Sequence, residues 1–261
     1  MLNQNWKDKV IFLTGASSGI GEALAIALAE KGAILGLLAR REDLLKSIAE
    51  KCEKVGGKAR IFACDVTDEK GVTESIKSFQ SEFGRIDILI CNAGIGGSMH
   101  AKDLTNEAFR KVIDVNLMGA VYAVTAVLPK MIERNSGQLV AISSLAGFRG
   151  LPMSASYSAS KGAMTNFFES LRLDLLQNDI AVTIIQPGFI LTPLTSDRKN
   201  KLPFLMKLDD AIPLFIRAIE KKKRFSAFPW QLATIVRLGR LFPGWLYDKI
   251  AGNTKYREEK N

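Results

Sequence analysis

Short, continuous apolar segments alternate along this chain with longer segments of helical periodicity. The expected strands are residues 10–14, 34–39, 59–63, 87–91, 137–143, 180–186 and 225–228. The expected helices are residues 20–31, 42–54, 69–83, 105–133, 155–177 and 209–222. Apolar strands are typical of a sheet that is covered on both faces, and helical connections favour right-handed crossovers. The alternation therefore predicts an α/β fold: a doubly wound parallel sheet of about seven strands with helices on both faces.

A glycine-rich turn follows the first expected strand. It reads Gly15-Ala16-Ser17-Ser18-Gly19-Ile20-Gly21 and runs into a helix rich in alanine and leucine. The glycines allow the backbone to approach a pyrophosphate, and the helix N-terminus offers free N–H groups and a partial positive charge. The spacing Gly-x-x-x-Gly-x-Gly differs from the common dinucleotide fingerprint. The turn predicts a nucleotide-phosphate site, and the alternative is a turn that is glycine-rich for steric reasons alone.

Tyr157 and Lys161 are four residues apart in an expected helix and therefore share one face. Because a neighbouring positive charge favours a phenolate, Lys161 is expected to lower the pKa of Tyr157. Ser144 lies thirteen residues upstream of Tyr157, at the end of an apolar run. Alternation along the strand turns Ser143 to the opposite face, and Ser160 should face about 100° away from Lys161, so Ser144 is the preferred hydroxyl. The alternative for the pair alone is a helix with an exposed lysine and a packed tyrosine.

In order and separation, these motifs resemble those of the short-chain dehydrogenase/reductase family. The resemblance covers about residues 9–195 and is carried by Thr14 to Gly21, Asp65-Val66, Asn92-Ala93-Gly94, Asn116, Ser144, Tyr157 with Lys161, and Pro187-Gly188. It implies one Rossmann-type catalytic domain over residues 1–261, which transfers a hydride between nicotinamide and a carbonyl or hydroxyl carbon. The residues after about 195 match the family only loosely.

The resemblance also assigns roles to individual residues. Tyr157 is the expected general acid/base, Lys161 holds the nicotinamide ribose, and Ser144 donates to the substrate oxygen. Asn116 resembles the family's helix asparagine that positions a water behind the lysine, with an ordinary buried amide as the alternative. The expected cofactor-binding residues are Gly15, Ser17, Ser18, Gly19, Ile20, Gly21, Arg40, Arg41, Asp65, Val66, Asn92, Ala93, Gly94, Tyr157, Lys161, Pro187, Gly188 and Thr192. No metal site is expected.

The charge that follows the second expected strand indicates the cofactor. Arg40 and Arg41 come directly after that strand, and the nearest acidic residue is Glu42. An acidic residue would accept hydrogen bonds from a ribose 2′-hydroxyl, whereas a guanidinium suits a 2′-phosphate. Arg40, assisted by Arg41 or Ser17, is therefore expected to bind that phosphate, and NADP(H) is predicted in preference to NAD(H). The alternative is a solvated arginine pair at a helix start.

Apolar residues follow Pro187 in a region, residues 190–230, that resembles the family's substrate lid. The expected lid side chains are Phe189, Ile190, Leu191, Leu194, Leu202, Phe204, Leu205 and Met206, and the expected opposite wall is Leu145, Phe148, Leu151 and Met153. Such a pocket suits a lipid-, steroid- or fatty-acyl-like carbonyl or alcohol better than a sugar. The alternative to an enzyme is a non-catalytic NADP-binding regulatory protein or a membrane-associated scaffold of the same fold.

Positive charge is concentrated near the C-terminus. Residues 1–198 carry 22 basic and 21 acidic side chains, whereas residues 199–261 carry 14 and 6. The predicted basic amphipathic extension, residues 231–261, mixes aromatic, apolar and basic side chains between Gln231 and Ile250, which suits the interface of an anionic membrane. The alternatives are that the same residues cap the substrate pocket or form a subunit interface. Basic charge alone is non-specific, so nucleic acid is not an expected partner.

Location and assembly are expected from the remaining features. The polar residues that precede the first strand leave no room for a signal peptide, and no apolar run reaches eighteen residues. The chain has three cysteines, Cys52, Cys64 and Cys91, and their spacing is not that of metal ligands. They are therefore expected to be free thiols in a reducing compartment. A cytoplasmic protein is predicted, with the inner membrane face as a candidate contact, and the resemblance implies a homo-oligomer.

Overall fold

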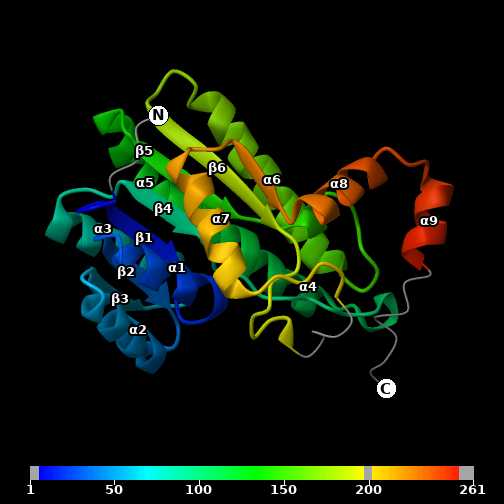
Figure 1. Cartoon of the computed structure of the whole chain (residues 1–261), viewed down its shortest axis with the longest axis horizontal. Helices are drawn as coiled ribbons and strands as arrows, with labels where there is room; N and C mark the ends of the chain where they lie inside the picture. Colours follow the sequence, from blue (N-terminus) through cyan, green and yellow to red (C-terminus); the bar gives the residue numbers. More distant parts are fainter. Residues whose placement is uncertain (1–5, 197–201, 253–261) are drawn as a thin grey trace.

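One parallel sheet organises the molecule. The computed structural model describes residues 6–196 and 202–252, and within them seven parallel strands pair in the order β3-β2-β1-β4-β5-β6-β7 (Figure 1). The strands are β1 (Val10–Thr14), β2 (Ile34–Ala39), β3 (Lys58–Ala63), β4 (Ile88–Cys91), β5 (Gly137–Ile142), β6 (Ile180–Pro187) and β7 (Phe225–Phe228). The predicted doubly wound parallel sheet is confirmed, because helical crossovers leave from both sides of β1.

Helices cover both faces of this sheet. They are α1 (Gly19–Ala29), α2 (Glu42–Lys54), α3 (Glu69–Phe83), α4 (Asn106–Ile113), α5 (Gly119–Arg134), α6 (Ala155–Asp174), α7 (Leu208–Glu220), α8 (Trp230–Gly239) and α9 (Gly244–Gly252). Ile11 and Leu13 of β1 pack with α1, α2 and α7, whereas Val10 and Phe12 pack with α3, α5 and α6. Successive strand residues point to opposite faces, so a strand covered on both sides must be apolar throughout.

The predicted helix over residues 105–133 contains an unexpected feature. A π-helical turn, η2 (Asp114–Met118), separates α4 from α5 and turns Asn116 into the interior, where it is fully buried. The helical segment Asn106–Arg134 is long and apolar enough to cross a membrane by length and composition alone. Of its most apolar window, 39% is buried in the structure, and the segment packs against α3 and α6.

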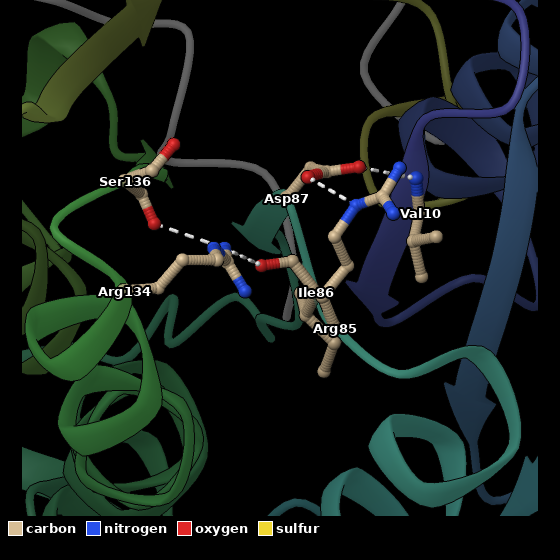
Figure 2. A network of polar contacts seen from close by, with 6 residues as sticks. All are labelled: Val10, Arg85, Ile86, Asp87, Arg134 and Ser136. Atoms are coloured by element: carbon tan, nitrogen blue, oxygen red, sulfur yellow. Dashed lines mark hydrogen bonds and ion pairs between the residues drawn. The ribbon is translucent and has the colours of Figure 1, made fainter.

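A polar network fixes the amino-terminal ends of the central strands. Its members are Val10, Arg85, Ile86, Asp87, Arg134 and Ser136 (Figure 2). Asp87 Oδ2 accepts a hydrogen bond from the backbone N–H of Val10 at 3.0 Å, and Oδ1 accepts one from Arg85 Nε at 2.9 Å. Arg134 Nη2 donates to the carbonyl oxygens of Ile86 and Ser136 at 2.9 Å each. Ligands of such sheets bind at the carboxyl ends of the strands. The network lies at the opposite edge of the sheet.

The C-terminal part divides differently from the prediction. Within the predicted lid of residues 190–230, α7 and β7 belong to the body, since Phe215 and Phe228 pack with their ring centroids 5.0 Å apart in the core. The expected apolar helix beyond residue 231 is two helices, α8 and α9, interrupted before Pro243, which lacks the N–H that would continue a helix. Both helices lie at one end of the molecule (Figure 1). Residues 197–201 of the predicted lid and 253–261 of the predicted extension lie outside the described residues.

Candidate active site

The glycine-rich turn joins β1 to α1 and is held in place from the neighbouring strand. Asn92 Nδ2 donates to the carbonyl oxygens of Thr14 at 3.1 Å and Gly15 at 3.0 Å. Thr14 Oγ1 accepts from the backbone N–H groups of Asn92 and Ala93. Gly15 has φ +68°, and a Cβ atom there would lie 2.6 Å from Ala93 Cα. Asn92, predicted to line the cofactor channel, therefore also braces the turn.

The other two glycines of the turn serve different purposes. Gly19 has φ +60°, and a Cβ atom there would lie 3.4 Å from the Thr192 side chain. Gly21 is buried, and its Cβ would lie 2.1 Å from Gly15 O. Gly21 thus permits α1 to pack against the turn and does not itself reach the groove above it. An open turn, a helix N-terminus and a nearby hydroxyl side chain fit a dinucleotide phosphate.

A groove of about 350 Å³ runs over this turn. The predicted cofactor residues that line it are Gly15, Ser17, Ser18, Gly19, Ile20, Arg40, Arg41, Asp65, Val66, Asn92, Ala93, Gly94 and Thr192. Four others, Tyr157, Lys161, Pro187 and Gly188, line an adjoining cavity that shares Ile20, Asn92, Gly94 and Thr192 with the groove. The fold thus brings the predicted cofactor residues together along one continuous surface, with the exception of Gly21.

Arg41 gathers the two hydroxyl groups at the start of α1. Its Nη2 donates to Ser17 Oγ at 2.9 Å and to Ser18 Oγ at 2.8 Å. Arg40 points elsewhere, with its Nη1 3.5 Å from Asp65 Oδ2. The sequence ranked Arg40 above Arg41 because it comes first after the strand. In the structure, Arg41 is the arginine that bonds to both hydroxyls of the turn, and both arginines line the groove.

Asp65 is held as a carboxylate beside the groove. Burial alone would raise its pKa, but hydrogen bonds from the backbone N–H and hydroxyl of Thr67, together with the charge of Arg40, outweigh burial and keep the pKa below its usual value. The Thr67 bonds measure 3.0 and 2.9 Å and form a local turn. Asp65 therefore presents a fixed acceptor at the end of β3.

Three predicted catalytic side chains meet beside the cavity. α6 carries Tyr157 and Lys161, and Ser144 follows β5 and is hydrogen-bonded to the Tyr157 phenol. Ser144 Oγ also accepts from the backbone N–H of Ala146 at 3.1 Å. Lys161 Nζ donates to the carbonyl oxygen of Ile142 at 2.9 Å and lies 6.0 Å from the centroid of the Tyr157 ring. The helical spacing of four residues places phenol and ammonium on one side, as predicted.

Burial decides the protonation of this pair. It raises the pKa of Tyr157, because a phenolate is poorly solvated there, while the hydrogen bond with Ser144 opposes the shift. Burial also lowers the pKa of Lys161 to about 8, against a smaller opposing effect of Cys91. The pKa of Tyr157 is raised and not lowered as expected, because burial is the largest effect on it and Ser144, not Lys161, is the group that opposes burial. Tyr157 is consequently a protonated phenol at neutral pH.

Asn116 connects the loop after β4 to α6. Its Oδ1 accepts from the backbone N–H of Ile95 at 2.7 Å, and its Nδ2 donates to Ile95 O and to Ser160 Oγ at 3.0 Å each. Ser160 in turn donates to the Tyr157 carbonyl oxygen at 2.8 Å. Neither Asn116 nor Ser160 lines the groove or the cavity. Sequence reasoning set Ser160 aside, and only the π-helical turn brings Asn116 to it.

The cavity beside Tyr157 has a volume of about 450 Å³ and a mainly apolar wall. Of the predicted wall, Leu145, Leu151, Phe189, Ile190 and Leu194 line it. The other predicted wall residues, Phe148, Met153, Leu191, Leu202, Phe204, Leu205 and Met206, are not among its lining residues. The sequence could not separate the two groups, because Phe204 is about half exposed whereas Met206 packs against the core under α1 and α7.

The two C-terminal helices complete the cavity. Their lining side chains are Leu232, Ile235, Val236, Phe242, Tyr247, Ile250 and Ala251, with Phe242 coming from the connection between the helices. Arg149 lines the cavity from the opposite loop. Of the alternatives left open for this segment, the structure supports a cap over the pocket. Among residues 6–196 and 202–252, no group of three or more His, Cys, Asp or Glu side chains could hold a metal ion.

Comparison with known proteins identifies the family. The model of the short chain dehydrogenase family matches residues 9–203. The chain belongs to this family. Its members are oxidoreductases that bind a nicotinamide cofactor, which agrees with the groove over the glycine turn and the side chains gathered at its end.

Relatives of this short-chain dehydrogenase cover most of its length. An uncharacterized oxidoreductase of Myxococcus xanthus is 40% identical over 243 residues, which are 93% of this chain and 96% of that protein. An 11-beta-hydroxysteroid dehydrogenase-like protein of Arabidopsis thaliana is 39% identical over 184 residues, 70% of this chain and 61% of that protein.

Solved structures agree with the fold. A short-chain type dehydrogenase/reductase from Mycobacterium marinum superposes with a TM-score of 0.80 at 27% identity, covering 86% of this chain and 95% of that one. A short chain dehydrogenase/reductase from Burkholderia phymatum, solved in complex with NAD, has a TM-score of 0.84 at 24% identity over 91% of this chain and 94% of that one. At 24% identity, the similarity to the Burkholderia phymatum structure supports the fold alone.

Proposed function

We propose that this short-chain dehydrogenase is an NADP(H)-dependent oxidoreductase that transfers a hydride between nicotinamide and the carbonyl or hydroxyl carbon of a hydrophobic substrate. The observation that carries the proposal is the continuity of two spaces. The groove over the glycine turn and the apolar cavity share Asn92, Gly94 and Thr192, and Tyr157 and Ser144 line the cavity. A dinucleotide in the groove and a substrate in the cavity would therefore meet beside the phenol.

Tyr157 is the proposed proton donor. Its raised pKa keeps the phenol protonated, so the proton can pass to the substrate oxygen as the carbonyl carbon is reduced. Ser144, hydrogen-bonded to the phenol, donates to the same oxygen and stabilises the negative charge that develops there. Bound NADPH would supply the hydride. The same phenol, acting in reverse as a phenolate, would accept the proton when an alcohol is oxidised.

Lys161 is the proposed ligand of the nicotinamide ribose. A Cβ atom at Gly94 would lie 3.4 Å from Lys161 Nζ and 3.3 Å from Asn116 Oδ1, so the glycine leaves the ammonium accessible. With a pKa of about 8, Lys161 is mostly protonated at pH 7. Asn116 and Ser160 act as positioning residues, because they tie the loop after β4 to the first turns of α6.

The apolar wall supports a hydrophobic substrate. The cavity has a volume within the range of small-molecule sites, and its wall is mainly apolar. The steroid dehydrogenase-like name of the Arabidopsis relatives suits the same class of substrate. We expect NADPH oxidation in the presence of long-chain or cyclic ketones and little with sugars, measured by loss of NADPH absorbance. Turnover of sugars but of no hydrophobic ketone would contradict the substrate class.

We further propose that the protein is cytoplasmic and that α8 and α9 bring it to the inner face of an anionic membrane. Trp230, Leu241 and Trp245 are 72%, 79% and 70% exposed. Exposed basic residues accompany them, Arg237 and Arg240 among them, in the part of the chain that holds nearly all of its excess positive charge. Exposed tryptophans and leucines beside arginines suit an interface with anionic headgroups.

Vesicle flotation tests this contact. The protein is expected to float with vesicles that contain anionic lipid, more weakly with neutral ones, because both apolar insertion and charge contribute. The double variant Leu241→Ser/Trp245→Ser should lose most of the recovery, since both side chains are largely exposed and their loss should not disturb the core. Leu173→Ser/Leu176→Ser is the matched control, because both leucines are exposed, the first near the end of α6 and the second just after it. If all three proteins are recovered equally, Leu241 and Trp245 do not contact the vesicles and the membrane proposal is removed. A second copy of the chain would then be favoured as the partner that covers these two side chains.

A further inference from the structure

Arg149 reaches from the loop after η3 (Leu145–Gly147) to the connection between the two C-terminal helices. Its Nη1 donates to the carbonyl oxygen of Gly239 at 2.6 Å and to that of Phe242 at 3.2 Å. Gly239 is the last residue of α8, and its carbonyl oxygen also accepts the backbone N–H of Phe242 at 3.3 Å, so the guanidinium lies at the negative end of the helix dipole. Arg149 therefore fixes the point at which the chain leaves α8.

Tyr247 of α9 completes the contact. The centroid of its ring lies 3.8 Å from Arg149 Cζ, within the range of a cation–π interaction. Its hydroxyl donates to the carbonyl oxygen of Gly150. Two adjacent loop residues thus hold the end of α8 and the middle of α9. Because both Arg149 and Tyr247 line the apolar cavity, this clasp, the contact of Arg149 and Gly150 with the two helices, is part of the cavity wall.

The two helices are attached unequally to the body. In α8, Ala233 is 3% exposed, and Leu232 packs so closely on Gly188 that a Cβ atom there would lie 2.8 Å from Leu232 Cδ2. In α9, none of the residues from Gly244 to Gly252 is buried. It lies at the outer end of the molecule (Figure 1). Its place over the cavity therefore depends on the clasp more than on core packing.

We infer that Arg149 is a specificity-determining residue, which holds α9 over the cavity and so determines how well the site binds the far end of a long or polycyclic hydrophobic substrate. The inference rests on the proposed function. Phe242 and Ile250 line the cavity beside this clasp. Phe242 comes from the connection between α8 and α9 and Ile250 from α9, whereas the reacting carbonyl would lie at Tyr157. Loosening α9 should weaken substrate binding without altering the chemical step.

Kinetics with two aldehydes of different length test this inference. For Arg149→Ala, we expect KM for decanal to rise about ten-fold with kcat unchanged, the size expected when charge-assisted hydrogen bonds and a cation–π contact are lost. KM for propanal should stay the same, because a short chain does not reach α9. Tyr247→Phe keeps the ring under Arg149 and loses only the hydroxyl bond, so its effect should have the same sign and be smaller. Arg110→Ala, an exposed arginine of α4, is the matched control.

Hydrogen exchange supplies a readout that does not depend on turnover. The backbone amides of residues 244–252 should exchange faster in Arg149→Ala than in the wild type, while those of α6 stay unchanged. An unchanged KM for decanal, an equal change for both aldehydes, or unchanged exchange in α9 would overturn the inference. If the wild-type protein reduces neither aldehyde, it is the proposed function that fails, and the exchange comparison alone decides whether Arg149 holds α9.

Discussion

Tyr157→Phe is expected to lower kcat for NADPH-dependent reduction of a hydrophobic ketone by about 10²–10⁴-fold, the range attributed to a positioned acid/base. The substitution removes a single oxygen, the one that is hydrogen-bonded to Ser144 and would carry the proton to the substrate. The ring remains, so the shape of the cavity wall is kept. The measurement is steady-state turnover with saturating NADPH.

Cofactor binding should survive this substitution. Fluorescence titration with NADPH is expected to give a Kd within about three-fold of the wild type, because the groove over the glycine turn does not include the Tyr157 side chain. Lost hydrogen bonding to Ser144 should cost only about 1 kcal/mol of stability. Tyr122→Phe, the same change in α5, should leave turnover intact. Full activity in Tyr157→Phe would assign the proton transfer to another group, and equal absence of activity in the wild type would favour the non-catalytic regulatory alternative.

Arg41→Ala is expected to raise KM for NADPH by about 10–100-fold, because hydrogen bonds to a charged group contribute roughly 1.5–3 kcal/mol. KM for NADH should change by less than about three-fold, since NADH carries no 2′-phosphate for the guanidinium to bind. The prediction follows from the two bonds of Arg41 to Ser17 and Ser18, which place its charge beside the start of α1. Initial rates with each cofactor measure the effect.

Two further variants separate this role from a structural one. Arg40→Ala should have the smaller effect on NADPH, since its exposed side chain is drawn toward Asp65. Arg60→Ala, which removes an exposed arginine paired with Glu82 at the edge of the sheet, should leave both cofactors unaffected. Equal losses for NADPH and NADH in Arg41→Ala would mean that Arg41 only shapes the turn. A larger effect in Arg40→Ala would restore the order that the sequence suggested.

The elements of the fold could be predicted because their signals are local. Apolar runs such as Val10–Thr14 and Ile34–Ala39 are strands in the sheet. They are apolar throughout because the crossover helices cover both faces of that sheet. The turn after Thr14 and the spacing of four residues between Tyr157 and Lys161 are also local, and parallel strands then bring their carboxyl ends to one edge. Such features depend on neighbouring residues along the chain.

The parts that could not be predicted depend on residues far apart in the sequence. The raised pKa of Tyr157 comes from burial by several elements, and the hydrogen bonds of Arg41 to Ser17 and Ser18 join residues more than twenty positions apart. The sequence left three places open for the C-terminal segment, and the contact of Arg149 with Gly239 and Tyr247 shows that its two helices lie over the cavity. The sequence by itself determined the order of strands and helices and the family's reactive side chains. Only the tertiary structure decided their protonation, their partners and the wall of the cavity, because solvation and contact are properties of what surrounds a side chain in space.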